Sequence, residues 1–171
     1  MECDVCGSHN VSRRTIDDAT LEECNLCGNL QGDDVAVQRI EELRAGRERG
    51  LDEEVIPLVT ALESTHVFRV IQSSAGNPRG NESPHVFFTL SRNDLSYIER
   101  LLRSVELANR DTRLRWIIEL SLQNEIVYIL RPRFWRPPSD ISPDDIRAAR
   151  KDLSTLGLRL RRDLALSWWN K

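Results

Sequence analysis

The four cysteines of this 171-residue chain all lie in its first 27 positions, in two copies of one local pattern. The pattern is Cys-x-x-Cys followed directly by glycine. Two residues between the cysteines let both thiolates of a tight turn reach one metal ion, and glycine tolerates the positive φ that points backbone N–H groups at the sulfurs. The spacing between the two pairs also suits a structural zinc site. We therefore predict one zinc ion with four thiolate ligands: Cys3, Cys6, Cys24 and Cys27.

Three other uses of four cysteines are open. Two disulfides are disfavoured because nothing marks the chain as exported. A redox Cys-x-x-Cys motif usually opens a helix after a strand and does not need a second copy. Iron held by four thiolates is chemically possible. Since four protein ligands fill the coordination sphere of zinc, we expect no catalysis at the metal.

Residues 1–30 resemble the zinc-ribbon family, in which two Cys-x-x-Cys-Gly turns, called knuckles, cap short antiparallel strands. We call this segment the ribbon. Zinc ribbons often bind nucleic acid, but this one carries two arginines against six acidic residues, a net charge of −4. Four thiolates with one zinc ion add about −2. Because affinity for nucleic acid comes mainly from neutralising phosphates, we expect the ribbon to dock a protein or to stabilise the fold.

Composition and charge limit the class of the whole chain. With 40% hydrophobic and 30% charged residues, it is neither collagen-like, disulfide-dense nor wholly disordered. No apolar run approaches the roughly 18 residues of a membrane span, and the first residues do not read as a secretory signal, so we expect a cytoplasmic protein with no membrane partner. Residues 1–65 have a net charge of −9 and residues 66–171 one of +6. This asymmetry suggests docking within the chain or a partner of one charge sign.

Helix and strand signals predict an α+β fold in which helices pack on a mostly antiparallel sheet. We divide the chain into the ribbon, a helical linker over 31–64 and an α+β domain over 65–171. Two helices are expected in the linker, from about 33 to 46 or 50 and from 52 to 62. The domain is expected to have a ββαββα core, with strands at 67–71, 86–90, 113–121 and 125–133 and helices beginning near 94 and 143.

Gly157 allows two interpretations of the last part of the chain. It stands where a glycine commonly ends a helix, and the alternation of Leu158-Arg-Leu160-Arg then predicts a closing strand. A continuous helix through Gly157 is the alternative, because Leu160 and Leu164 extend the apolar stripe of the preceding helix. Periodicity leaves both open.

No standard catalytic or nucleotide-binding motif occurs, and we interpret His66 and His85, which flank the first two predicted strands of the domain, as structural or exposed. The loop Ser73–Arg79 combines Ser, Gly, Asn and Arg, which can bind an anion or simply form a solvated connection. Ser73-Ser-Ala-Gly76 and Gly157-Leu-Arg159 resemble segments of the wyosine-base tRNA methyltransferases, although the family's cysteine is absent and Arg79 is displaced. That resemblance implies an enzyme acting on tRNA.

A second candidate site is the segment 131–138, where arginines alternate with aromatic residues and prolines. Arg131, Arg133, Trp135 and Arg136 could contact phosphates and bases, a protein partner, or the chain's own acidic half. The tryptophans at 168 and 169 are expected to pack on the core or, if exposed, to form a docking patch. Together these features predict a zinc-ribbon protein that acts as a protein-interaction or regulatory module. Nucleic-acid binding through the Arg-rich second half is the first alternative, and an enzyme with its site at 73–79 is the second.

Overall fold

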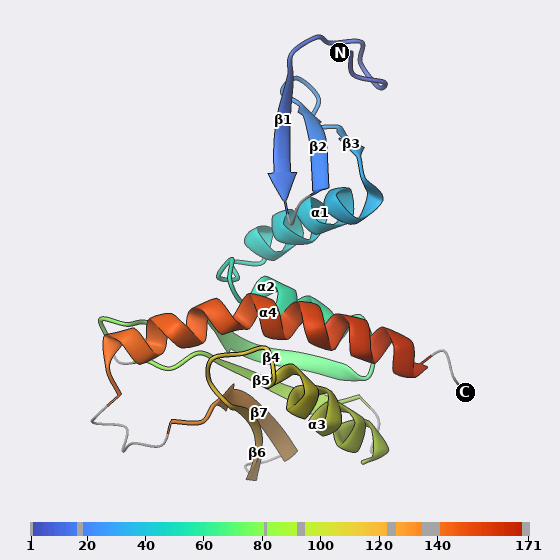
Figure 1. Ribbon diagram of the computed structural model, residues 1–171. Helices are drawn as coiled ribbons and strands as arrows, with labels where there is room; N and C mark the ends of the chain where they lie inside the picture. The colour runs from blue at the N-terminus through green and yellow to red at the C-terminus, as the bar shows by residue number, and fades with distance from the viewer. Residues whose placement is uncertain are drawn as a thin grey trace. The chain divides into compact units, whose positions relative to one another are not determined.

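The computed structural model describes residues 2–16, 19–80, 82–91, 95–122, 126–134 and 141–168. The chain divides into two compact units, Met1–Ala45 and Gly46–Lys171, and each is described by itself (Figure 1). Both contain helices and antiparallel strands, so the predicted α+β class is confirmed. Among the described helices, none combines the length and the apolar character needed to cross a membrane.

The first unit is a three-stranded antiparallel sheet followed by a helix. Strands β1 (Val11–Ile16), β2 (Ala19–Cys24) and β3 (Leu30–Gly32) lie in the order β1-β2-β3. Helix α1 (Asp34–Glu48) begins where predicted, because the Asp33 carboxylate accepts hydrogen bonds from the N–H groups of Val35 and Ala36. The apolar core of this unit is small, consisting of Leu21, Ala36 and Ile40 with Leu30 against them. A core of this size gives little stability on its own.

The second unit has four antiparallel strands in the order β4-β5-β7-β6. The predicted ββαββα succession is confirmed, with β4 (Phe68–Ser74), β5 (His85–Leu90), α3 (Ser96–Ala108), β6 (Trp116–Leu122), β7 (Ile126–Pro132) and α4 (Pro143–Trp168). Helices α2 (Ile56–Glu63) and α4 lie side by side in Figure 1, and α3 packs against α4. One face of the sheet, which includes Phe88, Trp116 and Leu130, joins these helices in a single core.

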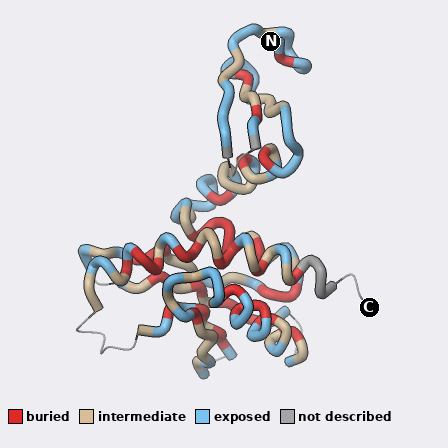
Figure 2. Tube along the Cα trace, viewed as in Figure 1, coloured by how far each residue is buried: buried red, intermediate tan, exposed pale blue. Residues whose placement is uncertain are grey.

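Helix α2 is buried almost all round. Six of its eight residues are buried, as the red of the trace in Figure 2 indicates, and several of them belong to the central core. A helix that is hydrophobic on every side belongs inside a protein, which is why α2 packs between other elements of the second unit. Leu58, Val59 and Leu62 of this helix lie in the core together with Val55, which directly precedes it.

Helix α4 corrects one prediction. It runs without a break through Gly157 to Trp168, so the helix end at Gly157 and the closing strand at 158–161 are wrong, and the continuous helix is right. The cause is tertiary packing: a Cβ on Gly157 would lie 2.6 Å from the backbone nitrogen of Leu58. The glycine is there to let α4 approach α2 closely, while Leu156, Leu160 and Leu164 continue the buried stripe.

Candidate metal centre

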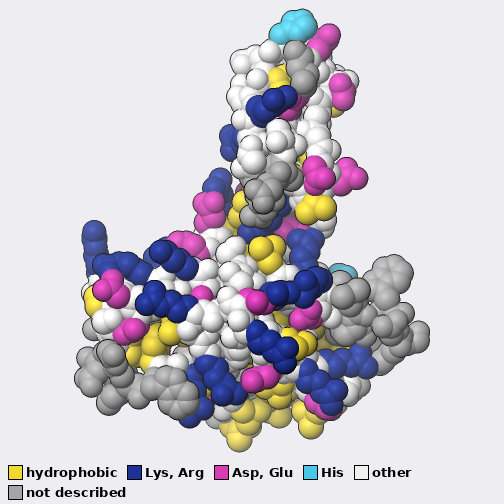
Figure 3. Space-filling view, viewed as in Figure 1, with side chains coloured by type: hydrophobic (Ala, Val, Ile, Leu, Met, Phe, Trp, Pro, Cys, Tyr) yellow, Lys and Arg dark blue, Asp and Glu magenta, His cyan; other side chains and the backbone are white. Residues whose placement is uncertain are grey.

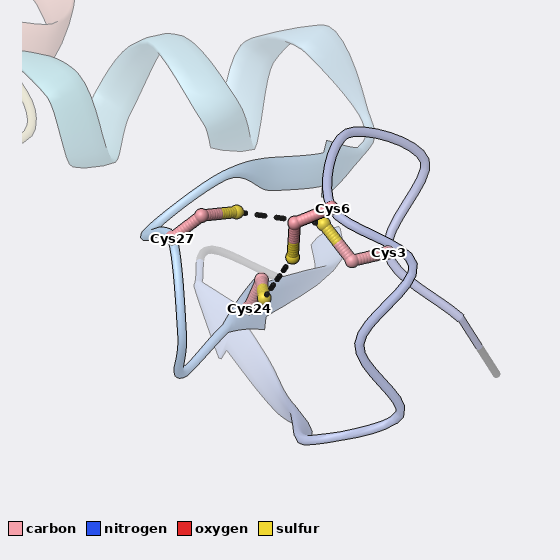
Figure 4. A group of neighbouring side chains, drawn as sticks. All are labelled: Cys3, Cys6, Cys24 and Cys27. Atoms are coloured by element: carbon pink, nitrogen blue, oxygen red, sulfur yellow. Dashed lines mark hydrogen bonds between the residues drawn. The ribbon is translucent and has the colours of Figure 1, made fainter.

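The four cysteines come together at one end of the first unit. Figure 4 shows Cys3 and Cys6 before β1, Cys24 at the end of β2 and Cys27 in the turn that follows, with their sulfurs directed toward one another. All four Sγ atoms lie within 4.8 Å of one another. The Sγ atoms of Cys3 and Cys27 are 3.6 Å apart and those of Cys6 and Cys24 are 3.5 Å apart. A disulfide needs about 2.0 Å, whereas the edge of a tetrahedral thiolate site with bonds of about 2.3 Å is about 3.8 Å.

The two knuckles have the same backbone structure. In each, the glycine after the second cysteine has a positive φ, 68° at Gly7 and 73° at Gly28. Each glycine N–H donates to the carbonyl of the first cysteine, at 2.9 Å from Gly7 to Cys3 and 2.8 Å from Gly28 to Cys24. This repeated turn places the four sulfurs as two equivalent pairs.

Backbone N–H groups surround the sulfurs, as expected for thiolate ligands. Cys3 Sγ accepts from Cys6 and Val5, and Cys24 Sγ accepts from Cys27 and Leu26. The second cysteines follow the same rule, since Cys6 accepts from Ser8 and Cys27 accepts from Asn29. N–H groups that point at sulfur stabilise its negative charge, so the turns are built for thiolates.

These hydrogen bonds and the crowding of four thiols separate the pKa values. N–H donation by Cys27 and Leu26 lowers the pKa of Cys24 to about 6. N–H donation by Ser8 lowers the pKa of Cys6, but contacts with the Cys27 and Cys24 thiols and partial loss of hydration outweigh this and raise that pKa to about 12. Four sulfurs this close cannot all ionise unless a cation neutralises them. The cluster can therefore hold a metal ion, and a metal that binds must displace protons.

A polar network fixes the second knuckle to the first strand. The Asn25 side chain donates to Asn10 Oδ1 at 2.9 Å and to Ser12 Oγ at 2.7 Å, and its backbone N–H donates to the Asn10 carbonyl at 2.9 Å. These contacts hold the turn that carries Cys24 and Cys27 beside the strand that follows Cys6. The network supports the metal centre without supplying a ligand.

Both arginines of the ribbon are engaged with acidic neighbours. Arg13 pairs with Glu22 at 3.3 Å, and Arg14 pairs with Glu23 at 2.8 Å. Glu23 also forms an ion pair with Arg44 of α1, at 2.5 Å. Each arginine of the ribbon is thereby paired with a carboxylate on the sheet.

Each knuckle exposes one large apolar side chain at the same position. Val5 is 70% exposed and Leu26 is 73% exposed, and each directly precedes the second cysteine of its knuckle. We call this pair the knuckle patch. The Cys-x-x-Cys pattern predicts the four cysteines as a site, but it predicts no site at the residues between them. Their apolar character was the available signal.

The loop Ser73–Arg79, for which anion binding and a solvated connection were both open, makes hydrogen bonds to the rest of the second unit. Asn77 and Glu82 form an isolated antiparallel bridge, which leaves Arg79 exposed at the turn. The N–H of Ala75 donates to Asp52 at 2.9 Å, and Arg150 donates to the Gly76 carbonyl at 3.3 Å. These backbone groups of the loop thus form hydrogen bonds within the chain.

The two segments that resemble the tRNA methyltransferases have structural partners here. Gly76 N–H donates to Ser74 Oγ at 3.0 Å, and Arg159 pairs with Asp111 at 2.5 Å. His85 adjoins the loop because it pairs with Ser74, but His66 follows α2 at the other end of β4, so the two histidines are not brought together. No catalytic arrangement of these groups emerges among the described residues.

The Arg-rich segment is only partly described. Arg131 makes two hydrogen bonds to Glu119, at 2.7 and 2.9 Å. Arg131 and Arg133 line an open cavity of about 480 Å³ together with Ile117, Phe134 and Ile141. Trp135 and Arg136 lie outside the described residues, as do Trp169 and the side chain of Trp168. The structure thus places Arg131 and Arg133 side by side but holds Arg131 in an ion pair.

Comparison with known proteins adds no assignment. No family model, no curated protein and no solved structure matches the chain. The four-cysteine cluster and its small antiparallel sheet are consistent with a zinc-ribbon-like segment on their geometry alone.

Proposed function

We propose that Cys3, Cys6, Cys24 and Cys27 hold one structural zinc ion and that the ribbon acts as a protein-interaction module. Zinc is favoured because it takes four thiolates in a closed tetrahedron, which the 3.5 and 3.6 Å sulfur pairs and the N–H donors suit. When bound, zinc neutralises part of the thiolate charge and joins the two knuckles covalently. The backbone N–H groups around the cluster would orient the thiolates, and four thiolate ligands would leave no open position for a substrate.

The folding role of the metal follows from the size of the apolar core. Only Leu21, Ala36 and Ile40 are buried together in the described part of the first unit, apart from two of the cysteines. Small domains with so little apolar burial need a metal or disulfides for stability. The zinc ion would supply that energy and keep the knuckles in one conformation.

The knuckle patch is the observation that carries the interaction role. Val5 and Leu26 expose apolar surface on a segment whose neighbours include the exposed acidic residues Glu2 and Asp4. An apolar surface with an acidic border fits a protein that offers an apolar side chain next to lysine or arginine. Zinc would set the spacing of the patch, so binding would depend on the metal.

The proposal is tested by affinity capture with matched variants, followed by quantitative mass spectrometry. The double variant Val5→Glu/Leu26→Glu removes the patch but keeps all four ligands. Val35→Glu is the control, because Val35 is 75% exposed on α1 and lies outside the knuckles. A partner held by the wild-type protein and by the control, and lost from the double variant at unchanged zinc content, would support the proposal. Equal capture by all three proteins would refute it.

Nucleic-acid binding through the second half is the alternative proposal. In its favour, α4 exposes Arg147, Lys151 and Arg162. Against it, many arginines of this unit contact a carboxylate, which reduces the charge available to phosphates. The pairs given by the structure are Arg47–Glu53, Arg49–Glu63, Arg103–Glu99, Arg115–Glu106, Arg131–Glu119, Arg147–Asp144, Arg150–Glu54, Arg159–Asp111 and Arg162–Asp163.

A further inference from the structure

Strand β6 forms one edge of the four-stranded sheet. It pairs with β7 in an uninterrupted register from Trp116–Pro132 to Leu122–Ile126, and no other described strand pairs with it. Every second N–H and C=O group of an edge strand points away from its neighbour, where another strand can pair with it. The edge of β6 is therefore open to strand addition within the part of the chain that the structure describes.

The strand at the other edge, β4, has features that discourage pairing with a further strand, and β6 lacks them. Strand β4 has a register shift between Val70 and Gln72 and carries the exposed Arg69, two features that discourage pairing with a further strand. Strand β6 reads Trp-Ile-Ile-Glu-Leu-Ser-Leu, with no proline, no lysine and no register shift. Its one charge, Glu119, is matched by Arg131 on β7, so even this residue does little to repel a partner.

The far end of the β6–β7 hairpin also exposes apolar side chains. Trp116 is buried and Ile118 packs against the core, but Leu120 and Leu122, on the same face of the strand, are 55% and 73% exposed. Ile126, which pairs with Leu122, is 49% exposed. Figure 3 shows hydrophobic side chains gathered at the lower edge of the view, where Figure 1 places this hairpin. The helices thus do not cover the end of the β6–β7 hairpin that carries Leu122 and Ile126.

We propose that β6 pairs antiparallel with β6 of a second copy of this chain, about a two-fold axis at Leu120. Antiparallel pairing is what two-fold symmetry requires of two identical strands that lie side by side. An axis at Leu120 places Ile118 opposite Leu122 of the second copy and Glu119 opposite Ser121. An axis at Glu119 would place two like charges opposite each other, which is destabilising.

This pairing explains the exposed leucines through self-complementarity. Leu120 meets its own symmetry mate, and each Leu122 gains an apolar neighbour in place of water. The two sheets become one sheet of eight strands. A short ladder and a few apolar side chains bury less than the roughly 1,200 Å² of a standard stable interface, so we expect a weak dimer with a Kd in the micromolar range.

The experiment is sedimentation velocity on the full-length protein from about 1 to about 200 µM, the range in which a micromolar Kd is measurable. Leu120→Lys and Leu120→Glu each place like charges opposite each other at the axis and should raise the Kd about tenfold or more. An equimolar mixture of the two should bring the Kd back to within about threefold of wild type, because Lys then opposes Glu. Leu158→Lys, on the exposed surface of α4, is the control.

Each result decides the proposal. Weakening in both variants with rescue on mixing supports it, and Leu122→Lys should also weaken the dimer if a position-120 variant fails to fold. A wild-type protein that stays monomeric throughout the range overturns it. Unchanged dimerisation of the position-120 variants would assign the dimer to another surface. Weakening without rescue would exclude an axis at Leu120.

Discussion

Gly157 of α4 and Leu58 of α2 meet through bare backbone: a Cβ on Gly157 would lie 2.6 Å from the Leu58 nitrogen. A distance that short cannot be relieved by turning a side chain, because the Leu58 nitrogen and the Pro57 carbonyl carbon belong to the main chain of a buried helix. The two helices therefore depend on this residue having no side chain.

Gly157→Ala should destabilise the protein although alanine is the better helix former. The gain in helix propensity is about 1 kcal/mol, but the overlap forces α4 away from α2, and overpacking of this kind costs about 1–3 kcal/mol or more. We expect a net loss of at least about 1 kcal/mol in the free energy of unfolding, measured by urea denaturation. Leu158→Ala, at the neighbouring exposed position, serves as the control. A Gly157→Ala protein as stable as wild type would show that the helices can separate at no cost.

Cys24→Ser should remove the metal and unfold the first unit while the second unit stays folded. Cys24 is buried, its thiolate receives two N–H donors, and metal binding supplies much of the stability of a unit with a small apolar core. The metal content, by inductively coupled plasma mass spectrometry, should fall from about one ion per chain to near zero, as expected when one of four ligands is lost. Hydrogen exchange should lose protection over residues 11–32 and keep it in β5 and β7. Retention of zinc, or iron in place of zinc in the wild-type protein, would contradict the proposed centre.

Asp152 links α4 to the turn before β6, and removing its carboxylate should be costly. Its two oxygens accept from the N–H groups of Arg113 and Leu114 at 2.9 and 2.8 Å, and the residue is only 6% exposed. Asp152→Ala leaves both donors without their acceptor and should cost about 2–3 kcal/mol in the free energy of unfolding. Asp152→Asn keeps one acceptor and should cost less. Equal stability of both variants and wild type would mean that water replaces the carboxylate fully.

The ion pair of Glu54 with Arg150 should make part of the stability depend on pH. Burial raises the pKa of Glu54, but the hydrogen bond from Arg150, a backbone hydrogen bond and the charge of Arg150 together outweigh burial and hold the pKa below its ordinary value. A carboxyl with a lowered folded-state pKa stabilises the protein above its unfolded pKa of about 4.3, and this contribution disappears as the pH falls through the folded pKa.

Glu54→Gln should therefore reduce the free energy of unfolding at pH 7 by less than about 1 kcal/mol, since the pair is partly exposed. The difference from wild type should shrink as the pH drops below about 4. Urea denaturation across this range measures it, and in an Arg150→Gln background the difference should no longer shrink toward low pH, because both Arg150 contributions to the lowered pKa are gone. A difference that grows toward low pH would mean that folding raises the pKa of Glu54 instead of lowering it.

Affinity for nucleic acid separates the two functional proposals. If the ribbon is a protein-interaction module and the arginines serve internal ion pairs, fluorescence anisotropy with single-stranded RNA should show only weak binding at physiological salt. A phosphate-binding surface would instead give tight binding at low salt that falls steeply as the salt concentration rises. Tight binding that Arg147→Glu and Lys151→Glu abolish would favour the nucleic-acid alternative.

The four-cysteine cluster was predictable because each half of it is a local structure. The Cys-x-x-Cys-Gly pattern determines the turn, the positive φ of Gly7 and Gly28, and the direction of the N–H groups within a few residues. The hairpins and the start of α1 were predictable for the same reason, since alternating apolar residues and the capping Asp33 act over short distances.

The tertiary structure decided what depends on contacts between distant residues. Gly157 is a helix terminator by its local pattern and a helix contact in the fold, because α2 packs against it. The order of the strands in the sheet places β6 at one edge. Leu120 and Leu122 alternate with polar residues, as side chains that face a core do, but they are exposed because the helices do not cover this end of the sheet. By itself, therefore, the sequence determined the local turns, the element types up to Gly157 and the four cysteines that cluster. Which apolar faces are covered was set only by long-range packing, because burial depends on the neighbours that the whole chain supplies.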